Sequence, residues 1–127
     1  MQVAAWPKQV AVIGRYGLPI STDVAFLRES KREVVFVGDA DPVDLLVFAL
    51  LREYLSIRWL GVSDEFLLAQ GNQAWPRIQT PLASSEKETC KRLARFCPDY
   101  RSLLGTQCSA LLDAGMKIEL EGALLNK

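Results

Sequence analysis

The sequence predicts an α/β fold in which a small, Rossmann-like parallel sheet is followed by a helical C-terminal half. Residues 34–38 (VVFVG) form a continuous, β-branched apolar run, which is typical of a strand buried on both faces. Similar apolar runs at 10–13 and 57–62 alternate with segments that favour helices. Helical connections of this length favour parallel strands joined by right-handed crossovers.

Two helices are expected between these three strands. The first ends at about Glu29, and its cap is one of three polar residues, Ser21, Thr22 or Asp23. The second is strongly apolar and covers residues 42–55, with Asp41 as its N-cap and Pro42 in its first turn. Ser63 and Asp64 then suit the cap of a further helix.

The second half is expected to contain helices only. Residues 71–81 have a loop-like composition, and a helix follows from residue 84 to about 97, where Pro98 stops it. Another helix is expected from there to about residue 114, followed by a last amphipathic helix over residues 116–125.

Length and composition fit one compact domain. The chain has 127 residues, half of them apolar, which is enough for a single core. We therefore expect one domain over residues 1–127, with an α/β layer at 1–70 and a helical extension at 71–127. No segment has the length and hydropathy of a membrane span, and the N-terminus is a poor signal peptide, so we expect a cytoplasmic protein.

Residue counts exclude several kinds of chemistry. The chain has no histidine, which excludes Ser/His/Asp hydrolases and histidine-ligated zinc. Its three cysteines lack CxxC spacing and are interpreted as reduced thiols, mostly buried in helices. Lys plus Arg equals Asp plus Glu, so any binding of DNA depends on a local basic patch or on a partner chain.

An acidic pair follows the predicted strand at 34–38. Ligands of open α/β sheets collect outside the carboxyl ends of the strands, and Asp39 and Asp41 leave such an end. Residues two apart in an extended segment point the same way, so the two carboxylates are expected to converge. Carboxylate oxygens suit Mg²⁺, with Mn²⁺ as a substitute. The structural alternative is that Asp41 only caps a helix and Asp39 only holds the loop.

Four segments in order along the chain carry a family resemblance. They are residues 13–19 (IGRYGLP), 35–42 (VFVGDADP), 57–64 (IRWLGVSD) and 111–121 (LLDAGMKIELE). Together they resemble the Toprim domain, most closely that of the topoisomerase VI A subunit and of the related meiotic double-strand-break transesterase. Similar regions also occur in the nuclease subunit of Wadjet-type plasmid-defence systems.

The resemblance implies a Toprim-like fold and a role for metal in a DNA transaction. In such proteins the DxD carboxylates bind Mg²⁺, which steadies a DNA phosphate. Asp39 and Asp41 match this motif and are the implied metal ligands. Arg15 and Gly17 match a turn at the same edge and are the implied contacts to phosphate.

Two departures from the family pattern limit what the chain is expected to do alone. The Toprim strand that ends in a glutamate has no counterpart, since Gly14 stands at the end of the run at 10–13. The tyrosine of topoisomerase VI comes from a winged-helix domain, for which the sequence has no match. Asp64 and Glu65, beyond the third strand, are candidate auxiliary acids, and Asp44 is a third candidate. Each also suits a helix cap or the positive end of a helix dipole.

Two hypotheses follow. The first is a magnesium-binding Toprim-like domain that acts on nucleic-acid phosphates, completed by a partner protein or a second copy. The second is a Toprim-like scaffold that has lost its chemistry and serves as an assembly or regulatory module. A different phosphoryl-transfer fold with a strand-terminal DxD is a weaker alternative. A basic stripe on the helix at 84–97 is interpreted as part of a mixed, solvated face.

Overall fold

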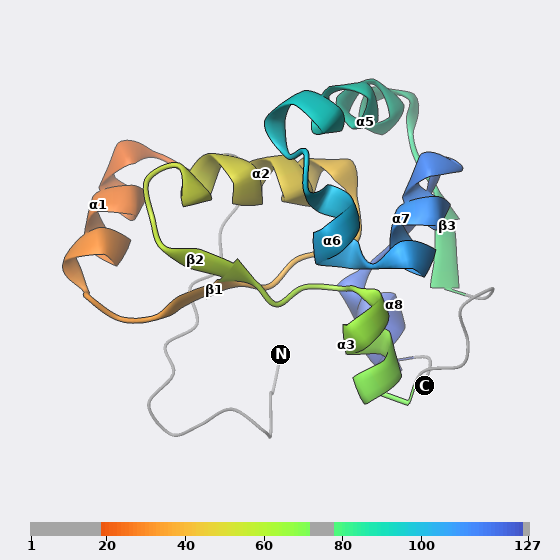
Figure 1. Cartoon of the computed structure of the whole chain (residues 1–127), viewed down its shortest axis with the longest axis horizontal. Helices are drawn as coiled ribbons and strands as arrows, with labels where there is room; N and C mark the ends of the chain where they lie inside the picture. Colours follow the sequence, from red (N-terminus) through yellow and green to blue (C-terminus); the bar gives the residue numbers. More distant parts are fainter. Residues whose placement is uncertain (1–18, 72–77, 126–127) are drawn as a thin grey trace.

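The computed structural model describes residues 19–71 and 78–125 and confirms a mixed α/β chain (Figure 1). The predicted strand at 10–13 and the turn with Arg15 and Gly17 lie outside the described residues. The elements, in order, are α1 (Ser21–Glu29), β1 (Val34–Phe36), α2 (Pro42–Arg52), β2 (Ile57–Trp59), α3 (Asp64–Ala69), β3 (Gln79–Pro81), α5 (Ser84–Phe96), α6 (Tyr100–Leu104), α7 (Thr106–Asp113), β4 (Met116–Ile118) and α8 (Leu120–Leu125).

The predicted parallel pairing is present as a two-stranded sheet. Val34 of β1 lies opposite Ile57 of β2, and Phe36 lies opposite Trp59. Hydrogen bonding continues past the strands, because the Val62 N–H donates to the Gly38 carbonyl at 2.9 Å. The residues of β1 are half-buried, so the expectation of a strand buried on both faces is wrong for the described structure.

Helix α2 lies between this sheet and α5 (Figure 1). Its predicted start is confirmed, because Asp41 is the N-cap and Pro42 the first helical residue. Phe48 of α2 is fully buried against two aromatic rings of the strands, Phe36 at 5.9 Å and Trp59 at 5.5 Å between centroids. The helix ends at Arg52, three residues before its predicted end.

The N-cap of α1 differs from the sequence expectation, whereas that of α3 agrees with it. The N-cap of α1 is Ile20, whose N–H donates to the Asp23 carboxylate at 3.1 Å. At α5, the Ala83 N–H donates to the Glu86 carboxylate at 2.9 Å. Asp23 and Glu86 thus each accept a bond from the backbone N–H of the residue just before their own helix. Ser63 caps α3 as predicted, accepting a bond from the Phe66 N–H at 3.0 Å.

The predicted helix up to residue 114 is divided into α6 and α7 at Gly105. This glycine has φ 89° and ψ 172°, a backbone conformation that is nearly restricted to glycine. A Cβ at this position would lie 2.6 Å from the Asp64 carboxylate. That carboxylate accepts bonds from the N–H groups of Gln107 at 2.9 Å and Cys108 at 2.8 Å, so Asp64 caps α7 from another element.

The expectation of an all-helical second half is wrong. Residues 79–81, predicted as loop, form β3, and residues 116–118, predicted as helix, form β4. The two strands pair antiparallel, with Gln79 opposite Ile118. Residues 116–120 (MKIEL) alternate apolar and charged residues, which is the period of a strand. The last helix therefore begins only at Leu120.

One core joins the two halves of the described chain. Its main cluster combines Ala40, Leu45 and Val62 from the first half with Leu93 and Ile118 from the second, among others. A smaller cluster under α1 contains Val47, Leu51 and Leu55. Within residues 19–71 and 78–125, none of the helices combines the length and the hydropathy that crossing a lipid bilayer requires.

Candidate metal centre

Three carboxylates converge where β1 leads into α2. Asp39 and Asp41 follow the carboxyl end of β1, and Asp44 lies in the first turn of α2. Each offers one oxygen, and these oxygens all lie within 4.8 Å of one another. The cap of α2 brings the third acid in, because the Asp44 N–H donates to the Asp41 carboxylate at 2.8 Å. The acidic pair expected from the sequence is therefore part of a group of three.

The loop that holds the acids is fixed by strand β4 and the start of α8. The Ala40 N–H donates to the Ile118 carbonyl at 2.9 Å, which forms an isolated antiparallel bridge. Beside it, the Leu120 N–H donates to the Asp39 carboxylate at 2.7 Å. This donor lies at the first position of a helix, where backbone N–H groups have no partner within the helix. The C-terminal segment thus orients Asp39.

Gly38 allows the acids to approach one another. A Cβ at Gly38 would lie 2.9 Å from the Asp44 carboxylate and 2.6 Å from the Phe36 ring. The Asp39 N–H donates to the same Asp44 carboxylate at 2.7 Å. A side chain at position 38 would therefore displace the Phe36 ring, Asp44 or both.

The ionised forms of Asp39 and Asp41 are disfavoured, because the acids of the site are close together and withdrawn from water. Burial, together with the charges of Asp44 and Asp39, raises the pKa of Asp41 to about 7. Burial also raises the pKa of Asp39, and the nearby charges of Asp44 and Glu119 act in the same direction. The bond from the Leu120 N–H and the charge of Lys117 partly offset that rise.

Lys117 and Glu119 reach the site on either side of Ile118 in the β4 segment. Lys117 donates to Glu86 of α5 at 2.9 Å, and both side chains are largely withdrawn from solvent, at 17 and 15% exposed. Lys117 also lies 3.7 Å from Glu119. Its charge lowers the pKa of Asp41, so one cation is shared between the acids of the site and Glu86.

Of the three candidate auxiliary acids, Asp44 lies with the pair, whereas Asp64 and Glu65 lie elsewhere. Asp64 uses its carboxylate on the backbone of α7, and Glu65 is exposed at the start of α3. Within the described residues, the acidic group suited to a metal consists of Asp39, Asp41 and Asp44. The spacing of Asp44 three residues after a helix cap was the available signal for its position.

Other residues considered from the sequence have structural roles. Trp59 stacks on Phe36 at 5.5 Å, which confirms its expected place in the core. The Tyr100 hydroxyl donates to Asp113 at 2.7 Å. Lys91 pairs with Glu88 at 2.8 Å on α5, as expected for a mixed, solvated helix face. Trp75 and Tyr16 lie outside the described residues.

Replacing Leu120 with proline is expected to disturb Asp39 selectively. Proline removes the N–H that Asp39 accepts, yet it is tolerated at the first position of a helix. We expect the free energy of unfolding to fall by about 1–2 kcal/mol relative to Leu120→Ala, which retains the N–H. Urea denaturation of the two variants measures this difference, and equal stabilities would contradict an orienting role for the Leu120 N–H.

Comparisons of the chain with protein-family models, with curated proteins and with solved structures gave no match. The functional conclusions below therefore depend on the residues and on the geometry of the described structure.

Proposed function

We propose that this chain is a Toprim-like domain that binds Mg²⁺ through Asp39 and Asp41 and acts on nucleic-acid phosphates together with a partner chain or a second copy. The observation that carries the proposal is the convergence of three carboxylates, including Asp44, with ligand oxygens within 4.8 Å of one another. Each carboxylate raises the cost of ionising its neighbours, and a bound divalent cation would offset that cost.

The donor set suits a hard divalent cation. All three side chains offer oxygen, and Mg²⁺ binds few carboxylates while it keeps several waters and open positions for phosphate. Burial and the neighbouring acids raise the pKa of both Asp39 and Asp41, so a nearby positive charge would favour their ionised forms. A bound Mg²⁺ would supply that charge and a template for a phosphate group.

The chain's own residues then have separate roles. Asp41 combines capping of α2 with an oxygen for the ion, and Asp39 is oriented by the Leu120 N–H. Asp44 provides the third acid, in place of the glutamate that the Toprim pattern normally carries on an earlier strand. Lys117, held by Glu86, lowers the pKa of Asp41 and so limits the repulsion among the acids.

Titration with Mg²⁺ or Mn²⁺ tests the proposal. The wild-type protein is expected to bind the ion and to unfold at a higher temperature in its presence, because ligand binding stabilises the folded state. Asp39→Asn/Asp41→Asn is expected to lose both effects. Asp23→Asn/Glu65→Gln removes the same charge from α1 and α3 and is the matched control. Equal, negligible binding by the wild type and the site variant would refute the metal site.

A scaffold without chemistry is the second candidate, and a specific observation favours it. The carboxylates of the site accept backbone bonds, Asp39 from Leu120, Asp41 from Asp44, and Asp44 from Asp39. Through these bonds the acids stabilise the backbone of the loop and of the helix starts, and no ion is needed for that role. A scaffold predicts a stable oligomer or partner complex whose mass, measured by sedimentation, is the same in EDTA and in Mg²⁺. It also predicts that no form of DNA is cleaved or ligated.

A further inference from the structure

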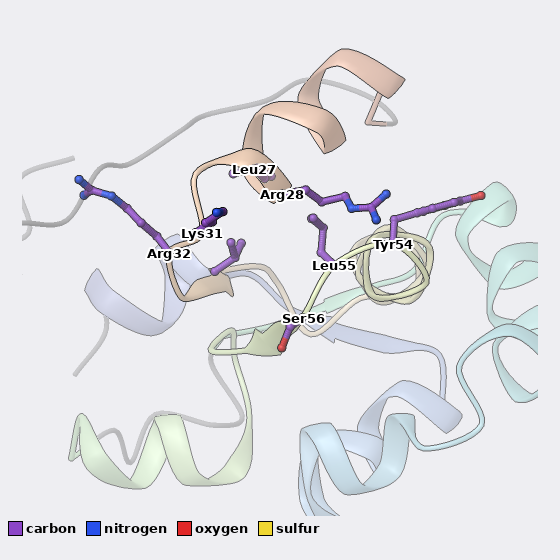
Figure 2. Close-up of a pocket in the computed structure, with 8 residues that line it drawn as sticks. Leu27, Arg28, Lys31, Arg32, Tyr54, Leu55 and Ser56 are labelled. Carbon is purple, nitrogen blue, oxygen red and sulfur yellow. The ribbon is translucent and has the colours of Figure 1, made fainter.

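A second candidate site lies at the opposite end of the parallel strands from the acids. A pocket of about 270 Å³ is formed where α1 leads into β1 and where α2 leads into β2 (Figure 2). Its lining comprises Leu27, Arg28, Lys31, Arg32, Val34, Tyr54, Leu55 and Ser56. Val34 and Ser56 stand at the beginning of the strands, whereas Asp39 follows the end of β1. The pocket is therefore separate from the candidate metal centre.

The charged side chains in the described lining of this pocket are all basic. Arg28, Lys31 and Arg32 line it, and none of the described residues in its lining carries a carboxylate. Within the described part of the chain, none of the three has an ion pair, whereas neighbouring Arg58 pairs with Glu33 at 3.0 Å. The C-terminal ends of α1 and α2 also face this region, but together they contribute only about one negative charge. Three cations therefore leave an excess of positive charge, which suits an anion.

The remaining lining of the pocket suits a flat ring. Leu27, Val34 and Leu55 form an apolar surface, and Tyr54 beside them is 62% exposed. In Figure 2, Arg28 and Tyr54 lie on one side of Leu55, and Lys31 and Arg32 lie on the other. A ligand that spans the pocket would therefore meet an aromatic ring and a cation on one side and two further cations on the other. An exposed tyrosine next to arginine offers stacking to a base.

Lys31 has an unusual backbone conformation for a lysine. Its φ is 53°, in the left-handed region that glycine or asparagine adopts more readily. Lys31 follows the C-cap Ser30, and its N–H donates to the Arg28 carbonyl at 3.4 Å, so this conformation is a left-handed cap that ends α1. The cap places Lys31 where α1 leads into β1, in the lining of the pocket.

We infer that this pocket binds a nucleotide unit, with the phosphate on Lys31 and Arg32 and the base against Tyr54, Arg28 and the apolar surface. The unit is either a free nucleotide or one residue of a single strand, since both present the same phosphate and ring. Because no acid of the metal centre takes part, binding is independent of divalent cations and of the function proposed above.

Fluorescence anisotropy in EDTA tests this inference with two probes, a fluorescent nucleoside monophosphate and a labelled single-stranded oligothymidylate. Arg28→Ala/Lys31→Gly/Arg32→Ala is expected to weaken binding at least roughly tenfold, because phosphate contacts dominate such affinities. Lys87→Ala/Arg92→Ala/Arg95→Ala removes the same charge from α5 and should change affinity less than about twofold. Lys31→Gly alone suits the positive φ and tests the pocket with the fold retained.

The base contact has its own measurement. Tyr54→Ala is expected to weaken binding of the nucleotide probes by roughly fivefold or more, while competition by inorganic phosphate is unchanged. Binding of the free nucleotide would identify a small-molecule site, and binding of the oligonucleotide alone would identify a strand contact. Either result supports the inference. No binding of either probe, or equal losses in the pocket and α5 variants, would overturn it.

Discussion

Replacing Asp41 with asparagine is expected to stabilise the ion-free protein at neutral pH by about 2–4 kcal/mol. Asp41 is buried, 7% exposed, beside two other acids, and its pKa is raised from 3.8 to about 7. Each unit of such a shift corresponds to roughly 1.4 kcal/mol of unfavourable ionisation. Asparagine removes the charge and remains one of the best N-cap residues, so α2 keeps its cap.

The sign of the pH dependence follows from the direction of that shift. Between pH 3.8 and about 7, the folded state binds more protons at Asp41 than the unfolded state does. The stability contributed by the protonated Asp41 is therefore complete below the unfolded value and is lost as the pH rises through about 7. The raised pKa of Asp39 adds to the same slope.

Urea denaturation in EDTA between pH 5 and 8.5 measures this effect. The free energy of unfolding of the wild type should decrease with pH, and that of Asp41→Asn should decrease less, because only the raised pKa of Asp39 remains. Asp23→Asn makes the same change at an exposed helix start and serves as the control. If Asp41→Asn is less stable than the wild type at pH 8, then ionised Asp41 does not destabilise the folded state.

Replacing Lys117 with methionine is expected to lower the free energy of unfolding by about 3 kcal/mol at neutral pH. The change leaves Glu86 without its cation while 15% of that side chain is exposed. Burial alone would raise the pKa of Glu86, but bonds from the Ala83 N–H and from Lys117 lower it overall. The Glu86 bond also raises the pKa of Lys117, so the pair contributes stability between roughly pH 5 and 10.

The same substitution is expected to act on the metal centre, because Lys117 lowers the pKa of both Asp39 and Asp41. Without it, the pH-dependent loss of stability should extend to higher pH. Lys117→Met/Glu86→Gln leaves no uncompensated charge and should recover part of the loss in a double-mutant cycle. Lys91→Met breaks an exposed pair and should change stability little. Additive effects of the Lys117 and Glu86 changes would contradict a coupled pair.

Local sequence signals were sufficient for the part of the fold that contains the acidic pair. The β-branched run before Gly38 and the Asp41–Pro42 cap depend on neighbouring residues, so strand β1, helix α2 and their parallel partner β2 could be predicted. Convergence of Asp39 and Asp41 follows from the same local geometry. The extent of the sheet does not follow from these signals.

The sequence alone determined the position of the acids, the helix that follows them and the exclusion of histidine chemistry. Tertiary structure decided their surroundings. It paired Ala40 with Ile118, which brought Lys117 and Glu119 from the distant C-terminal segment beside the acids, and it assigned Asp64 to the backbone of α7. Residues 116–120 alternate as a strand does, but their partner strand lies far away in the sequence. Pairings of that kind are set by packing between distant segments, which a local pattern does not contain.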